Sequence, residues 1–229
     1  MKLHNIKHVY FDLDHTLWDF ERNSELAFAE VFKKQNLGLQ LADFLKVYQP
    51  INFKYWELYR NNEVSSEDLR YGRLKESFES LEFTVEDALV TMMAEDYIEF
   101  LPKNNHLLQD TIIVLDILKE KYDLHIITNG FEEVQHKKMK GAGISHYFKT
   151  ITTSEEAGVK KPHSGIFEKA LGKTTAIAEN SVMIGDNLEA DVLGAVDFGM
   201  FAVYLDPVIQ KTQNQYIQIQ KLKELLNYL

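Results

Sequence analysis

The chain has 229 residues, enough for one large domain or for a core with a small second unit. Hydrophobic residues make up 45 % and charged residues 26 %, which argues against disorder, and the lack of cysteine excludes disulfides, thiolate zinc sites and cysteine nucleophiles. The formal net charge of −10 disfavours nonspecific binding to nucleic acid, which needs clustered cations.

The chain begins with a polar segment and a short apolar run. Residues 1–8 contain no apolar secretion segment, and nowhere do about 18 uninterrupted apolar residues occur, as a membrane span would require. We therefore expect a cytoplasmic protein without membrane contact. The run from His8 to Asp12 is short, β-branched or aromatic, and ends in an acid, which predicts a buried strand.

A helical region follows, from Phe20 to about Phe100. Its apolar residues recur at helical spacing, and no strand pattern interrupts them. Ser65 precedes two early acids and predicts the start of a helix, because its hydroxyl can accept from free backbone N–H groups. Pro102 marks a break, and the apolar stripe of residues 107–122 predicts a further helix.

From Leu124 onward, short apolar runs alternate with helical segments, which predicts a parallel sheet. Strands are expected at 124–128, 148–154, 181–186 and 200–206, and helices near 132–141, 165–171 and 190–198. Residues 217–229 predict a closing helix, and the Gln-rich stretch 210–220 is expected to fray. We therefore predict an α/β fold: a Rossmann-like parallel-sheet core of residues 1–18 and 101–229, interrupted after its first strand by a helical insertion of residues 19–100.

Polar side chains stand where three of the predicted strands end. Asp12, Thr128 and Asp186 are these residues, and ligands of open parallel sheets bind at this edge. Thr128-Asn129-Gly130 and Gly185-Asp186-Asn187 are rich in small and turn-forming residues, so their backbone N–H groups can face an anion. The pattern predicts a site of the size of a phosphate group.

Two acids stand close together in Asp12-Leu13-Asp14-His15-Thr16. Like charges at this separation repel, so they are tolerated only with a cation between them or with one carboxyl protonated. Magnesium, which prefers oxygen ligands, would meet this need, with Asp186 as a further ligand and Asp191 as an additional acid nearby. Lys161 could neutralise a phosphoryl oxygen or hold a nucleophilic carboxylate ionised.

Each of these features also has a purely structural interpretation. An isolated Asp-x-Asp pair is usually a turn or a cap, residues 128–130 could form a plain turn, and Lys161 before a proline could be a solvated loop residue. For His15, the simpler interpretation is that its side chain points away from the site. The joint order and location of the features favour chemistry. The aromatic residues Trp18, Trp56, Tyr59 and Tyr71 are expected to pack the helical insertion.

The chain resembles the phosphatases of the haloacid dehalogenase (HAD) superfamily that carry a helical cap. Four motifs occur in the family's order: residues 12–16, residues 128–130, Lys161-Pro162, and Gly185-Asp186 through Asp191. The resemblance implies that residues 1–18 and 101–229 are the catalytic core and residues 19–100 the cap. It also implies that Asp12 is a nucleophile forming an aspartyl phosphate, while Asp14 protonates the leaving group and later deprotonates water.

The same resemblance implies a set of binding residues. Magnesium would be held by Asp12, the backbone carbonyl of Asp14, and Asp186. Thr128, Asn129 and Gly130 would hold the phosphate together with Lys161. Asp191 would support Lys161 or a metal-bound water from behind.

Two further features concern the substrate. An aspartate at position 14 favours a phosphatase or phosphomutase, since a dehalogenase has no leaving alcohol to protonate. Residues 55–59, 71–73 and 127–131 are similar to the noncanonical pyrimidine 5′-nucleotidases, which implies a phosphorylated small molecule, a pyrimidine nucleoside 5′-monophosphate, as substrate. The alternatives are a sugar-phosphate phosphatase or phosphomutase, a phosphoacceptor domain whose aspartyl phosphate persists, and an interaction protein that has lost activity.

Overall fold

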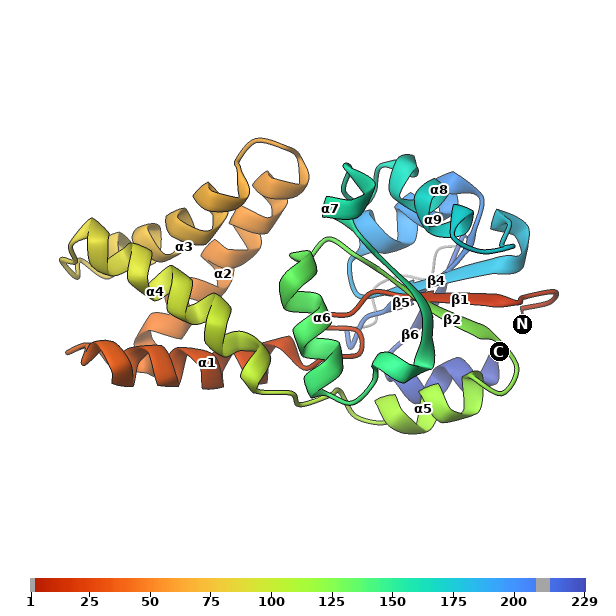
Figure 1. The fold of residues 1–229 in the computed structure, drawn as a ribbon, viewed down its shortest axis with the longest axis horizontal. Coiled ribbons are helices and arrows are strands. Elements are labelled where there is room, and N and C mark those ends of the chain that lie inside the picture. The colour runs from red at the N-terminus through yellow and green to blue at the C-terminus, as the bar shows by residue number, and fades with distance from the viewer. Residues whose placement is uncertain (1–2, 209–214) are drawn as a thin grey trace. The chain divides into compact units, whose positions relative to one another are not determined.

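A computed structural model describes residues 3–208 and 215–229 (Figure 1). It consists of two compact units, Met1–Phe20 with Asn105–Leu229, and Glu21–Asn104. The chain leaves the first unit after Phe20 and returns at Asn105, whereas the sequence analysis placed these points after residues 18 and 100. No helix within the described parts of the chain is long and apolar enough to cross a membrane.

The first unit is built on a six-stranded sheet with the strand order β3-β2-β1-β4-β5-β6, in which every neighbouring pair is parallel. The strands are β1 (His8–Phe11), β2 (Asp123–Thr128), β3 (Phe148–Thr153), β4 (Ser181–Gly185), β5 (Phe201–Leu205) and β6 (Ile217–Ile219). All four residues of the central β1 are buried, as expected when helices cover both faces of a parallel sheet. This confirms the predicted α/β fold.

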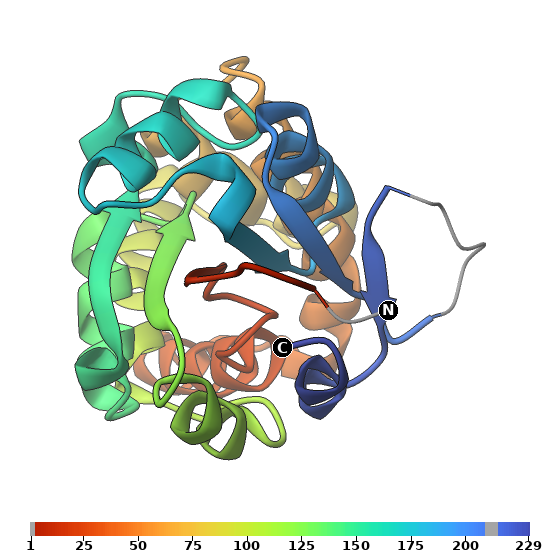
Figure 2. The same ribbon diagram turned by 90° about the vertical axis from the view of Figure 1, so that its right-hand side faces the viewer.

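Helices cover the sheet on both sides (Figures 1 and 2). The helices α8 and α9 lie on one face, and α5 and the C-terminal 3₁₀ turn lie on the other. The bounds are α5 (Thr111–Leu118), α6 (Glu132–Gly141), α7 (Ser154–Ala157), α8 (Ser164–Gly172), a π-helix (Leu188–Leu193) and α9 (Gly194–Phe198), with 3₁₀ turns at Ser145–Tyr147, Ala178–Asn180 and Leu222–Asn227. The helix predicted over 107–122 is therefore shorter than expected.

The predicted closing helix over residues 217–229 is wrong. Ile217–Ile219 form β6, which pairs with β5, and a 3₁₀ turn over Leu222–Asn227 follows. The alternation Ile-Gln-Ile has the period of a strand, and it buries Ile219 against the core. Residues 210–214 of the Gln-rich stretch lie outside the described residues.

The second unit is helical. Its elements are α1 (Phe20–Gln35), α2 (Leu41–Arg60), α3 (Ser66–Ser80), α4 (Asp87–Phe100) and a 3₁₀ turn (Leu101–Lys103). Ser65 caps α3 as predicted: its hydroxyl accepts from the Asp68 N–H, and the Asp68 carboxylate accepts from the Ser65 N–H. Aromatic rings fill the interior, with Phe28 stacked on Tyr97 at 4.3 Å between centroids.

The four tryptophan and tyrosine residues expected to pack the helical unit divide between the two units. Trp18 belongs to the parallel-sheet unit, where its side chain is fully buried, so that part of the expectation is wrong. Trp56 and Tyr59 pack edge to face within α2. Tyr71 donates a hydrogen bond to Asp87 at 2.8 Å, which ties α3 to α4.

Candidate active site

The strand ends predicted to form a site are adjacent in the sheet. Asp12 directly follows β1, Thr128 ends β2, and Asp186 directly follows β4. Because β1 lies between β2 and β4 and all three are parallel, these residues come to the same edge. The Asp12 N–H donates to the Ile184 carbonyl at 2.9 Å, so the pairing of β1 with β4 continues up to the site.

Lys161 joins three segments of the site. Its ammonium group donates to Asp12 Oδ1 at 2.6 Å and to the Ile127 carbonyl at 2.7 Å, and it lies 2.6 Å from Asp191 Oδ1. The residue is 2 % exposed, so it is not a solvated loop lysine. Burial alone would lower the pKa of Lys161, but the carboxylates of Asp12 and Asp191 outweigh it and raise that pKa. Lys161 is therefore a fixed cation.

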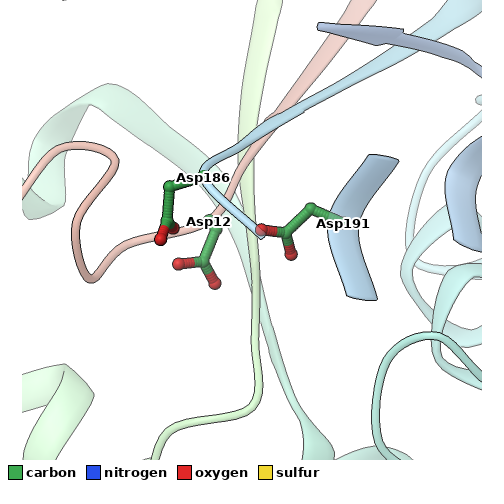
Figure 3. A group of neighbouring side chains, drawn as sticks. All are labelled: Asp12, Asp186 and Asp191. Carbon is green, nitrogen blue, oxygen red and sulfur yellow. The ribbon is translucent and has the colours of Figure 1, made fainter. Parts of the chain in front are cut away.

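Three carboxylates lie close together in the site (Figure 3), and Lys161 contacts two of them, those of Asp12 and Asp191. One carboxylate oxygen from each of Asp12, Asp186 and Asp191 lies within 4.8 Å of the others. Burial, together with the charges of Asp191 and Asp186, raises the pKa of Asp12 to about 8 despite Lys161. Burial and the charge of Asp191 raise the pKa of Asp186 to about 7. A single lysine thus leaves negative charge uncompensated, and the cluster favours a further cation.

The hydrogen bonds distinguish which of the three acids can hold a metal ion. Asp191 has both oxygens engaged, Oδ1 by Lys161 and Oδ2 by the Asn187 N–H at 3.0 Å. Within the described chain, the Asp12 carboxylate accepts only from Lys161, through Oδ1, so one lone pair of Oδ1 and both lone pairs of Oδ2 remain available. Asp186 is held by the Thr16 hydroxyl, which donates to its Oδ1 at 3.2 Å. Asp12 and Asp186 can thus bind an ion that prefers oxygen ligands, whereas Asp191 supports Lys161 through its ion pair.

The position of Asp191 depends on the chain around it. It lies in the π-helix, where the Asp191 N–H and the Val192 N–H both donate to the Asn187 carbonyl, at 3.0 and 3.3 Å. A Cβ atom at Gly185 would overlap the Asp191 carboxyl group. The glycine of the Gly185-Asp186 motif therefore makes room for this close approach.

Asn129 uses its side chain on Lys161. Its Nδ2 donates to the Lys161 carbonyl at 3.0 Å, and its Oδ1 accepts from the Lys161 N–H at 2.8 Å. The amide thus holds the Lys161 backbone in place. A direct contact of Asn129 and Gly130 with substrate stays a prediction.

Thr128 is 2 % exposed and already accepts two hydrogen bonds. The donors are the Gly130 N–H at 3.1 Å and Gln135 Nε2 at 2.7 Å. With both lone pairs used, the hydroxyl proton of Thr128 is available to donate. This is the bond that the predicted phosphate contact requires.

Asp14 has partners that the sequence analysis missed. Lys138 Nζ donates to both carboxylate oxygens, at 2.7 and 2.9 Å, and Gln135 Nε2 donates to Oδ2 at 3.0 Å. Gln135 and Lys138 lie three residues apart, on one face of α6, the first helix after β2. The three-residue spacing of Gln135 and Lys138 is a signal that the two share one helix face, but the surrounding His-Lys-Lys run is typical of a solvated face.

His15 has φ of 59°, and its ring lies 4.8 Å from that of Phe20.

Known proteins are similar to this chain in sequence and in fold. The chain is 27 % identical over 225 residues to the HAD-hydrolase YfnB of Bacillus subtilis, covering 96 % of this chain and 94 % of YfnB. A crystal structure of YfnB bound to magnesium superposes with a TM-score of 0.88 at 26 % identity, covering 97 % of each chain.

Two other relatives are phosphatases. The pyrimidine 5′-nucleotidase YjjG of Escherichia coli is 29 % identical over 202 residues, 86 % of this chain and 85 % of YjjG. The glyceraldehyde 3-phosphate phosphatase of Methanothermobacter thermautotrophicus is 27 % identical over 234 residues, 96 % of this chain and all of that protein. The sequence profile of the haloacid dehalogenase-like hydrolases matches residues 9–205, and the chain belongs to that family.

Proposed function

We propose that the protein is a magnesium-dependent phosphomonoester hydrolase that works through an aspartyl phosphate on Asp12. The observation that carries this proposal is the buried Asp12 carboxylate, with one oxygen fixed by Lys161 at 2.6 Å and the other available. A nucleophile needs a free lone pair and a defined direction, and this arrangement provides both.

In the first step, an oxygen of Asp12 attacks phosphorus, and the bond from phosphorus to the ester oxygen breaks. The leaving oxygen takes a proton from Asp14 and departs as an alcohol. Lys161 and the Thr128 hydroxyl stabilise the negative charge on the transferring phosphoryl oxygens.

In the second step, water attacks the phosphorus of the aspartyl phosphate. Asp14, now a carboxylate, accepts the proton of this water, and the bond between phosphorus and the Asp12 oxygen breaks. The products are inorganic phosphate and the original Asp12 carboxylate, so Asp14 ends the cycle protonated as it began.

The proposed metal ligands are Asp12, the backbone carbonyl of Asp14, and Asp186. When bound, magnesium would supply positive charge that offsets both the carboxylates and the phosphate. Asp191 holds Lys161 so that this lysine stays with Asp12 rather than in solvent.

We propose a pyrimidine nucleoside 5′-monophosphate as the substrate, selected by the helical unit acting as a cap. The support is the likeness to YjjG together with the aromatic residues of α2 and α3. A sugar-phosphate phosphatase is the second candidate, favoured by the likeness to the glyceraldehyde 3-phosphate phosphatase over the whole of that protein. Asp14 argues against a phosphoacceptor domain, because a residue able to deprotonate water shortens the life of an aspartyl phosphate.

The test is hydrolysis of an aryl phosphate, a nucleotide panel and sugar phosphates, with magnesium and with chelator. Asp12→Asn should lower kcat/KM by more than about 1,000-fold, since it removes the nucleophile. Asp197→Asn, an exposed acid on α9, is the matched control and should leave activity unchanged. Acid quenching during turnover should trap one added phosphoryl group on the native protein. Turnover that persists in Asp12→Asn would overturn the mechanism, and a preference for sugar phosphates would replace the proposed substrate.

A further inference from the structure

The carboxylate of Asp14 is held by one face of α6. Of the three hydrogen bonds that it accepts there, two come from Lys138 and one from Gln135. Asp14 itself lies in the turn between β1 and α1, where its short side chain is 21 % exposed and has only two rotatable bonds. The direction of this carboxylate is therefore set by α6.

The environment of Lys138 fits a residue with a fixed task. Its side chain is 3 % exposed, although lysine is almost never fully buried unless it is paired. Its ammonium group lies 4.4 Å from the centre of the Trp18 ring and 5.4 Å from that of Phe20, which stabilises a cation there. Both rings belong to the same unit as Asp14. The two rings thus help to hold the ammonium against Asp14.

Gln135 connects Asp14 to Thr128, at the end of β2. The same Nε2 group donates to Asp14 Oδ2 at 3.0 Å and to the Thr128 hydroxyl at 2.7 Å. A Cβ atom at Gly130 would overlap this amide. The bridge sets the position of Asp14 relative to a residue that faces the proposed phosphate site.

We propose that Lys138, assisted by Gln135, is a positioning residue that aims Asp14 at the leaving oxygen of the substrate. This inference rests on the proposed function. A general acid must lie within hydrogen-bond reach of the atom that it protonates, and a loss of aim costs rate even when the acid itself is intact. Lys138 acts on the reaction only through Asp14.

The proposal predicts that the defect depends on the leaving group. The quantity to compare is kcat/KM, because it reports the steps up to formation of the aspartyl phosphate and is insensitive to its later hydrolysis. An acidic phenol leaves without much help from a proton donor, whereas a nucleoside or another alcohol needs one. A poorly aimed Asp14 should therefore spare 4-nitrophenyl phosphate and impair alcohol esters.

The experiment compares Lys138→Met, Lys138→Arg, Gln135→Met and Asp14→Asn. Methionine matches the length of lysine and packs well between aromatic rings. The control is Lys137→Met: Lys137 is the neighbouring lysine on α6, is largely exposed, and pairs with Glu133. The substrates are 4-nitrophenyl phosphate, phenyl phosphate, an alkyl phosphate and a nucleoside 5′-monophosphate.

Lys138→Met should lower kcat/KM for the alkyl and nucleoside esters by about 10- to 100-fold, and for 4-nitrophenyl phosphate by less than about 3-fold. Asp14→Asn should show the same pattern with a larger loss, Gln135→Met a smaller one, and Lys138→Arg a partial recovery. Lys137→Met should match the native protein. Retained activity on 4-nitrophenyl phosphate also shows that the variant is folded.

An equal loss of kcat/KM on all substrates in Lys138→Met, or no loss on any, would overturn the inference. Either result leaves the proposed function standing as long as Asp12→Asn is inactive. If the native protein shows no hydrolysis that depends on Asp12, the proposed function has failed instead. The two failures are therefore distinguishable.

Discussion

The amide of Asn129 makes two hydrogen bonds to the backbone of one residue, Lys161, and this has a measurable consequence. Asn129→Ala removes both bonds and should let the Lys161 segment move, so the ammonium no longer holds Asp12 in one direction. We expect a fall in kcat of about 10-fold. Amide hydrogen exchange at residues 159–161 should accelerate, because the Lys161 N–H loses its acceptor.

Asn129→Asp disturbs the contact between Asn129 and the Lys161 backbone by a smaller change. It keeps the acceptor for the Lys161 N–H but places a second oxygen against the Lys161 carbonyl, so exchange should accelerate here too. Asn227→Ala, an exposed residue of the same unit, is the control. A loss of activity in Asn129→Ala without faster exchange at 159–161 would show that Asn129 serves the substrate and not the loop.

Single residues differ in how well the sequence predicts their place. The positions of Asp12, Thr128 and Asp186 were predictable because each stands where a strand of a parallel sheet ends, and the topology then brings them together. Lys161, in the loop after α7, and Asp191, in the π-helix, were predicted from the order of the motifs along the chain. Gln135 and Lys138 were not, because exposed lysines are the rule on helices and a three-residue spacing alone does not mark a pair as buried. Lys138 packs against Trp18 and Phe20, and Gln135 donates to Asp14, all of which are distant from α6 in sequence.

Two whole elements, the C-terminal segment and the segment after β4, were likewise not fully predictable from the local sequence pattern. Residues 217–229 contain leucines and isoleucines at mixed spacing, and pairing with β5 decides in favour of a strand for the first three. The helix expected near 190–198 is present as a π-helix followed by α9, because the Asp191 side chain must reach back to Asn187 and Lys161. In both segments the secondary structure depends on tertiary contacts, which a local sequence pattern does not contain.

The start of α3 is an element that local chemistry does determine, and it can be tested alone. Ser65→Ala removes the hydroxyl that accepts from Asp68 N–H and should lower the free energy of unfolding by about 1 kcal/mol. Urea unfolding followed by circular dichroism measures this loss. Ser66→Ala, at the first helical position, is the control and should change the midpoint little. Equal midpoints for the two variants would show that this cap contributes nothing to stability.

At the scale of the whole molecule, a buried histidine and the acid cluster of the parallel-sheet unit respond to pH in opposite directions. Burial lowers the pKa of His125 to about 4, with the neighbouring His8 adding to the effect, and Thr150 lies 2.8 Å from its Nδ1. A histidine with a lowered folded pKa stabilises the fold above its ordinary pKa, and this contribution is lost as pH falls from about 6.5 to 4. The contribution of His125 to the stability of the fold is complete above pH of about 6.5.

The acid cluster has the opposite sign. The pKa values of Asp12 and Asp186 are raised to about 8 and about 7, so the folded protein without metal holds protons that the unfolded chain has already lost. The stability from these protons is fully present below pH of about 4, decreases as pH rises from there, and is lost once pH has passed through 7 and 8. A bound divalent cation would replace the protons and remove this dependence.

The resulting prediction concerns thermal unfolding between pH 6.5 and 8.5, where the contribution of His125 no longer changes. In chelator, the protein should lose on the order of 2 kcal/mol over this range, a fall of about 5 °C in Tm for a chain of this size. Saturating magnesium should abolish most of the fall, and the increase in Tm that it produces should be larger at pH 8.5 than at pH 6.5. Asp12→Asn removes the group with the higher pKa and should flatten the curve without metal, whereas Asp197→Asn should retain it. A fall that is the same with and without magnesium would mean that the cation does not bind at this acid cluster.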